Sequence, residues 1–307
     1  MIPYFENGNS RLYYKDVGKG DPIFTNHGLS EDCNYWSESG VTSKMVTAGY
    51  RVISIDMRAH GRTKPISQEE EKGYDADTMY ADFDALADHL GIDKFHLLSH
   101  ATGGMVAARY GRKRSERLLS LILTDTSSQT GVVIPERDDL TDEQKAERDE
   151  RAKKWAETYD TPEKAAEAWR KIELSTTTEQ RMDGIRRDGW PYLHKMKSSE
   201  EKLKIYEGFL RRQDRNEIVD FMRNFYSDPD PGIDELRKIK CPVLVLLGEH
   251  DIVFLKPSEL MAKEIPDVRH VVMNGLGHMT AIEDPDRTTE EILDFIKTVE
   301  KTGNANK

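Results

Sequence analysis

The segments "GEHD" (residues 248–251) and "GLGH" (275–278) each place a titratable side chain just after an apolar run that predicts a buried strand. A carboxylate that orients a histidine lets the imidazole take a proton from a nucleophile and later return it to a leaving group. Because the carboxyl ends of parallel strands meet at one edge of a sheet, we expect these side chains to lie close together. We therefore predict that His278 is a general base and that Asp251 is the acid that orients it.

A third segment, "SHATGG" (99–104), has the pattern of a sharp turn from a strand into a helix. Such a turn forces its pivot residue to a positive φ and needs small residues two positions before and after the pivot. Ser99 and Gly103 meet that requirement around Ala101. A pivot of this kind usually carries a nucleophile. The methyl group of Ala101 cannot attack a substrate, so the turn is present without its functional atom.

The chain around these segments alternates short strands with amphipathic helices. Apolar residues at helical spacing between residues 75 and 90, followed by Gly91, predict a helix with a glycine stop. Residues 11–18 and 21–28 predict the two strands of a hairpin, with its turn at 17–22. Strands that alternate with helices form a mostly parallel sheet that is covered on both faces, so the sequence predicts an α/β fold.

The pattern changes between residues 132 and 235, where charged helical segments follow one another without a convincing strand. A buried strand then resumes in "CPVLVLLGEHD" (241–251). We therefore expect an α/β core domain made of residues 1–131 and 236–307, interrupted by a helical cap (lid) domain of residues 132–235.

The expected cap is rich in aromatic residues. We expect most of them to pack the helices together, and the rest to line an apolar pocket between the cap and the sheet. Pro191 is expected to break a helix, which would present Trp190 and Tyr192 as substrate-binding residues. The aromatic residues of the expected cap include Trp155, Trp169, Trp190, Tyr192, Phe209, Phe221, Phe225 and Tyr226.

The composition narrows the range of partners. With 45 basic and 56 acidic residues the formal net charge is −11, and no basic tract offsets it, so nucleic acid is not an expected partner. Cys33 and Cys241 form no metal-binding or disulfide pattern. No signal peptide is visible, and no apolar segment approaches the roughly 20 residues that cross a bilayer. We expect a cytoplasmic protein with a small-molecule substrate, no membrane partner, no metal and no other cofactor; its oligomeric state stays open.

The motifs and their order resemble those of the α/β-hydrolase family, and the resemblance covers most of the chain. "NHGL" (26–29) is similar to the family's His-Gly loop, "DMRAHGRT" (56–63) to its Asp-Arg-Gly loop, and "SHATGG" to its nucleophile turn. Ala59, Ser99 and Ala101 depart from the family's pattern. The resemblance is strongest to esterases, haloperoxidase-like enzymes and enol-lactonases. It implies a mostly parallel eight-stranded sheet flanked by helices, with an inserted helical cap.

The resemblance also implies a role for each motif. The backbone N–H groups of Leu29 and Thr102 would form the oxyanion hole, which stabilises the charge that develops during acyl transfer. Some relatives draw their acid from the strand that ends here at Asp125, so Asp125 is an alternative to Asp251, which fits its motif better. The substrate would be a carboxylic ester or lactone, including a bulky or macrocyclic one.

Ala101 leaves three interpretations open. The chain is a serine hydrolase whose serine was replaced by alanine, a natural relative that binds a ligand without catalysis, or a cofactor-free dioxygenase that uses His278 and Asp251 alone. We favour the first, because a chain released from catalysis has little reason to keep a strained turn together with both of these residues. Serine is the favoured missing residue, since Thr102 and the "HGLS" segment do not match relatives with an aspartate nucleophile.

Overall fold

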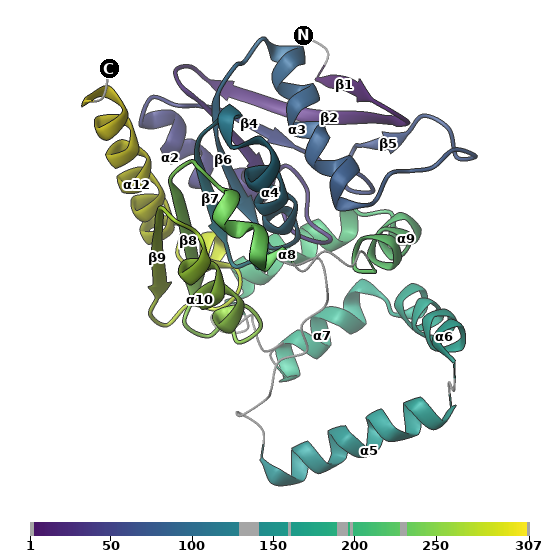
Figure 1. Ribbon diagram of the computed structural model, residues 1–307. Coiled ribbons are helices and arrows are strands. Elements are labelled where there is room, and N and C mark those ends of the chain that lie inside the picture. The colour runs from purple at the N-terminus through teal and green to yellow at the C-terminus, as the bar shows by residue number, and fades with distance from the viewer. Residues whose placement is uncertain are drawn as a thin grey trace.

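A computed structural model of the chain describes residues 3–128, 141–158, 161–188, 196, 199–227 and 232–305. One twisted sheet runs through the protein in the strand order β1-β2-β4-β3-β6-β7-β8-β9 (Figure 1). Its strands are β1 (Tyr4–Asn7), β2 (Ser10–Gly18), β3 (Pro22–Asn26), β4 (Arg51–Ile55), β6 (Phe95–His100), β7 (Leu118–Thr124), β8 (Val243–Gly248) and β9 (Val268–Met273).

The sheet is parallel from β4 to β9, whereas β1 and β2 are antiparallel at one edge. The expected mostly parallel sheet is therefore confirmed, but the expected count of eight strands is one short, because the described residues form a sheet of nine. A further strand of two residues, β5 (Lys64–Pro65), pairs with β2 outside the main path.

The expected hairpin of residues 11–18 and 21–28 is wrong. β4 lies between β2 and β3, and Arg51 is the register partner of both Gly18 and Pro22. The connecting segment does reverse the chain, but it passes over the start of β4. Gly18 and Gly20 have φ of +86° and +108°, and a Cβ atom at either would lie 2.4 or 2.0 Å from a backbone oxygen of residues 49–50. The two glycines that suggested a hairpin turn are needed because the segment passes close to the backbone at the start of β4.

Helices cover both faces of the sheet, and each face has its own apolar core. Neighbouring strand residues alternate between the two cores, as Leu97 and Leu98 on β6 illustrate. One face is covered by α3 (Ala76–Leu90), α4 (Ala101–Arg114) and α10 (Leu255–Glu264), and the other by α1 (Tyr35–Glu38), α2 (Val41–Thr47) and α12 (Pro285–Ala305). A short helix, α11 (Thr280–Glu283), precedes α12.

Helix α3 forms where the spacing predicts it. Asp75 caps its first turn by accepting a hydrogen bond from the Thr78 N–H at 2.7 Å. Gly91 ends it with φ of +65°, the left-handed conformation that glycine adopts without a Cβ penalty.

Between β7 and β8 the described residues form helices joined by short turns and loops, with no strand among them. The helices are α5 (Asp142–Thr158), α6 (Pro162–Ser175), α7 (Thr178–Asp188), α8 (Glu200–Arg212) and α9 (Arg215–Phe225), followed by the 3-10 helix η3 (Ile233–Lys238). In Figure 1, α8 and α9 lie beside the end of the sheet, and α5 is drawn far from it. Phe209, Phe221 and Phe225 are fully buried in the two cores of the sheet, so these aromatic residues pack the helices onto the core.

Within the described ranges, no helix combines the length and the apolar character that crossing a bilayer requires.

The last residue of β8, Gly248, has no room for a side chain. A Cβ atom at Gly248 would lie 2.1 Å from the carbonyl oxygen of Gly277, whereas a Cβ atom at Gly184 in α7 would meet nothing within 4 Å. We expect Gly248→Ala to lower the free energy of unfolding by about 1–3 kcal/mol, since backbone must move to admit the methyl group. Gly184→Ala, the matched control, should raise it by up to about 1 kcal/mol through helix propensity. Urea unfolding of both variants measures the difference, and equal stabilities would contradict this account of the β8 end.

Candidate active site

Ala101 is the pivot between β6 and α4, and its φ of +48° lies in the left-handed region that alanine rarely adopts. Two hydrogen bonds hold the turn: Thr126 Oγ1 donates to the Ala101 carbonyl at 2.5 Å, and the Gly103 N–H donates to the His27 carbonyl at 3.1 Å. A Cβ atom at Gly103 would lie 2.3 Å from that same carbonyl oxygen. The requirement for a small residue after the pivot therefore has a direct steric cause.

The loop after β3 lies against this turn. A Cβ atom at Gly28 would lie 3.0 Å from the Cβ of Ala101, so any larger residue at position 28 would crowd the pivot. Leu29 follows in the same loop, and Thr102 is the second residue of α4. Within the described ranges the N–H groups of Leu29 and Thr102 have no hydrogen-bond acceptor, which for Thr102 is the normal state of a first helical turn. Both donors are thus available beside Ala101.

His278 and Asp251 come together from the loops after β9 and β8. The Nδ1 atom of His278 lies 2.8 Å from Oδ2 of Asp251, whose side chain is fully buried, while the imidazole is partly exposed. The ring of Phe254 stacks on the imidazole with the centroids 5.2 Å apart. Two contacts therefore fix the imidazole plane, and its second nitrogen is the one directed away from the acid.

Asp125, the alternative acid, has other partners. Its Oδ2 accepts a hydrogen bond from Thr280 Oγ1 at 2.7 Å, and its Oδ1 accepts one from the Gly248 N–H at 3.2 Å. Burial raises the pKa of Asp125 to about 6, against the opposing attraction of His100. The carboxylate that contacts the His278 imidazole is that of Asp251.

Two of the residues singled out for substrate binding, Trp190 and Tyr192, lie outside the described residues. Of the other aromatic residues in the helical segment, Tyr226 reaches the turn directly, because its hydroxyl lies 2.6 Å from Thr102 Oγ1. That contact occupies the Thr102 hydroxyl, so this side chain does not replace the missing nucleophile.

Sequence reasoning missed Glu283, which lies in α11 and is 3% exposed. Its Oε2 accepts a hydrogen bond from the Gly277 N–H at 3.0 Å, and its Oε1 accepts one from the Met279 N–H at 3.2 Å. These two N–H groups flank His278, so one carboxylate holds the backbone on both sides of the imidazole. A glutamate a few residues after the histidine was visible in the sequence, but its burial was not.

His100, the residue directly before the pivot, is fully buried beside the site. Its Nε2 lies 3.5 Å from a Glu31 carboxylate oxygen, and its Nδ1 lies 3.5 Å from one of Asp125. Burial alone lowers the pKa of an imidazole, but the two carboxylates outweigh burial and raise the pKa of His100 to about 9.

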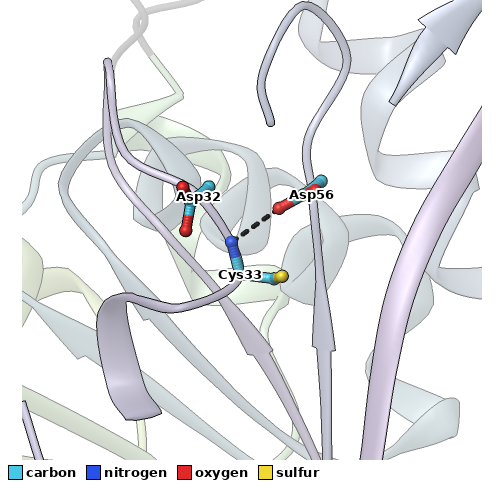
Figure 2. A group of neighbouring side chains, drawn as sticks. All are labelled: Asp32, Cys33 and Asp56. Atoms are coloured by element: carbon cyan, nitrogen blue, oxygen red, sulfur yellow. Dashed lines mark hydrogen bonds between the residues drawn. The ribbon is translucent and has the colours of Figure 1, made fainter. Parts of the chain in front are cut away.

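Asp32, Cys33 and Asp56 form a group whose ligand-type atoms lie within 4.8 Å of one another (Figure 2). The Asp56 carboxylate accepts hydrogen bonds from the Cys33 N–H at 2.6 Å and the Arg62 N–H at 2.8 Å, and Arg212 Nε donates to Asp32 at 2.6 Å. Burial and the nearby Asp56 carboxylate raise the pKa of the Cys33 thiol, whereas a metal would need the thiolate. In this arrangement the group anchors loops, and its thiol is held in the protonated form.

Comparisons with known proteins identify the family and the fold. Residues 21–285 match the sequence model of a family described as alpha/beta hydrolase fold. A non-heme chloroperoxidase of Kitasatospora aureofaciens is 27% identical over 93% of this chain and 95% of its own, and a non-heme haloperoxidase of Rhodococcus erythropolis is 25% identical over 94% and 97%. An esterase from Exiguobacterium antarcticum superimposes with a TM-score of 0.73 over 97% of this chain and 100% of its own at 20% identity, which is a likeness of fold.

The buried imidazole predicts a pH dependence of stability. The folded protein holds the His100 proton more tightly than the unfolded chain, so this stabilisation is complete below about pH 6.5 and is lost as the pH rises towards 9. We expect the free energy of unfolding to fall by about 1–3 kcal/mol across that window. His60 and His96 stay neutral there, because burial lowers their pKa values to about 3 and 4.

Urea unfolding at a series of pH values measures this fall, and ¹⁵N NMR of the histidine rings assigns it. A His100 ring that carries a single proton at pH 7.5, or a stability that does not change between pH 6.5 and 9, would contradict the assignment.

Proposed function

Because the chain belongs to the alpha/beta hydrolase fold family, we propose that its site is that of a serine-type hydrolase of carboxylic esters or lactones in which alanine occupies the nucleophile position. The observation that carries the proposal is the backbone of Ala101. Its positive φ costs an alanine energy, and at a strand-to-helix turn this conformation is the one that presents a nucleophilic side chain to a substrate. The His278–Asp251 pair supports the same interpretation, since it is the partner that such a side chain needs.

With serine at position 101, the chemistry follows from the geometry. The Nε2 atom of His278 takes the hydroxyl proton as the oxygen attacks the carbonyl carbon, and Asp251 stabilises the imidazolium at Nδ1. The N–H groups of Leu29 and Thr102 hold the carbonyl oxygen as it becomes negative. Collapse of the intermediate expels the alcohol with the proton from His278. Water, deprotonated by the same imidazole, then releases the acid and restores the serine.

The helical segment between β7 and β8 would serve as a cap over this site, with the domain boundaries expected from the sequence. Its contacts support this role: Gln213 donates to the Glu31 carbonyl and accepts from the Gly61 N–H, and Tyr226 reaches Thr102. These bonds join the end of α8 and the end of α9 to loops at the carboxyl end of the sheet. A ligand bound between cap and sheet would lose much of its contact with water, which suits a bulky ester or a lactone.

Ala101 itself favours a second candidate in which this chain binds a ligand and does not hydrolyse it. A third, a cofactor-free dioxygenase, would use the His278–Asp251 pair without a nucleophile and would need O₂ as co-substrate. Each differs from a hydrolase in what restoring a hydroxyl should do.

Ala101→Ser should raise kcat on activated esters such as p-nitrophenyl acetate by about 10³-fold or more, because the backbone already has the conformation that the turn requires. Ala101→Gly is the matched control: it relieves the strain without supplying an oxygen, and it should stay folded and inactive. Release of p-nitrophenol measures the difference. A folded Ala101→Ser variant as inactive as the glycine variant would favour the ligand-binding candidate, and O₂ uptake by the unaltered chain on an enolisable aromatic compound would favour the dioxygenase.

In the Ala101→Ser background, Asp251→Asn should lower kcat by about 10⁴-fold, because it removes the charge that stabilises the imidazolium. Glu249→Gln is the matched control. The Glu249 carboxylate lies in the same loop and accepts a hydrogen bond from the Gly275 N–H, but it does not contact the imidazole, so the kcat of this variant should stay close to that of the parent. Steady-state kinetics, with unfolding curves to confirm equal folding, make the comparison. If Asp125→Asn abolishes turnover while Asp251→Asn has a mild effect, the acid is on β7 and our assignment is wrong.

A further inference from the structure

Three loops that meet at the site are each held by a buried carboxylate. The loop after β3 is held by Glu31, which is 2% exposed and accepts a hydrogen bond from the Gly28 N–H at 2.6 Å. Gly28 directly precedes Leu29, the proposed oxyanion donor, and Ser30 after it has a positive φ of +61°. The direction of the Leu29 N–H therefore depends on a short, strained segment that Glu31 holds in place.

The loops that carry Asp251 and His278 are held by a second carboxylate, that of Asp125. It binds the Gly248 N–H, three residues before Asp251, and the hydroxyl of Thr280, two residues after His278. Asp125 also sits in a strained turn, with φ of +49° at the end of β7. One fully buried group thus fixes the spacing between the acid loop and the histidine loop.

His100 is the charged group that joins these two carboxylates. Its ring nitrogens lie 3.5 Å from Glu31 and 3.5 Å from Asp125, and Tyr35 stacks on the ring with the centroids 4.5 Å apart and the planes 10° from parallel. Thr124 Oγ1 lies 3.4 Å from the same Nδ1 atom as Asp125, and the titratable His278 ring lies 5.0 Å from the His100 ring. Because His100 is fully buried, solvent cannot supply a replacement partner for either carboxylate.

We propose that His100 is a positioning residue: its imidazolium ties the Glu31-held oxyanion loop to the Asp125-held loops of the acid and the general base. The expected effect of His100 on turnover rests on the proposed function, whereas its expected effect on the order of the loops does not. Without the cation, two buried carboxylates would lose the positive charge that they share, which favours protonation or movement of one of them. Either event would release the backbone that it holds.

The first arm of the test needs no activity and uses the chain as it stands. We expect His100→Gln to speed amide hydrogen exchange at Gly28 and at Gly248 together by about tenfold, measured by NMR, because both N–H groups lose a firmly held acceptor. Glu31→Gln should speed exchange at Gly28, leave Gly248 near its parent rate, and lower the pH at which the His100 ring loses its second proton. A structural role confined to β6 would move neither distant loop.

The second arm uses the Ala101→Ser background. Glu31→Gln and His100→Gln should each lower kcat by about 10–100-fold with KM within a factor of about three, since a displaced oxyanion donor weakens binding of the transition state more than binding of the substrate. The double variant should lose less than the product of the two single effects, because it removes both charges of one pair. Glu217→Gln, which removes a carboxylate that binds Lys72 and Tyr74, is the matched control and should leave kcat unchanged.

The two arms fail separately. An inactive Ala101→Ser parent would overturn the proposed function, while the exchange rates would still decide whether His100 ties the loops. Unchanged exchange at Gly28 and Gly248 in a folded His100→Gln variant overturns the positioning role. So do kinetic effects of Glu31→Gln and His100→Gln that multiply independently, or that fall on KM alone.

Discussion

The turn at Ala101 is the constraint on which the rest of the site depends. A chain that leaves a strand and enters a helix within one residue must adopt a positive φ there, and the neighbouring backbone must approach closely to keep it so. The glycine at position 103 and the loop at position 28 are both within contact of the turn, and neither tolerates a larger residue. The sheet contributes the rigidity: β6 lies at its centre with its neighbours β3 and β7 parallel to it, so the loops after these strands converge on the pivot.

Buried carboxylates hold the loops of the site in place through hydrogen bonds to their backbone. Glu31, Asp125 and Glu283 are each at most 3% exposed. Glu31 and Glu283 accept hydrogen bonds from backbone N–H groups next to Leu29 and His278, and Asp125 accepts one from the Gly248 N–H, three residues before Asp251. A hydrogen bond to a carboxylate is stronger than one to a neutral acceptor. A buried carboxylate that loses its donors is costly, so it keeps those donors in place. The loops therefore gain order from the same groups that would be costly to leave unpaired. The net charge of the surface is irrelevant to this arrangement, which is why composition gave no sign of it.

Much of the architecture is encoded locally and was predictable. The helix that ends at Gly91, the alternation of strands and helices, and the sharp turn at Ala101 follow from spacing, capping and small-residue patterns. The failed hairpin shows the limit: Gly18 and Gly20 signal a chain reversal, but only the distant β4 decides that another strand occupies the gap. Glu31, His100 and Glu283 were missed for a related reason. A charged residue in a sequence is normally expected at the surface, and nothing local reveals that its partners come from loops far along the chain.

The register between β7 and β8 has a consequence for how such a protein can diversify. Leu121 pairs with Val243, so the two strands meet side by side although more than a hundred residues separate them. The sheet and its loops are closed by this pairing whatever the length of the excursion, and doubling the length of a flexible connection adds only about 0.6 kcal/mol of closure entropy. Insertions, deletions and exchanges of helices in that excursion can therefore accumulate in descendants while the chemistry beneath is inherited unchanged. The segment that would determine ligand selectivity is therefore also the segment in which changes of length cost the least stability.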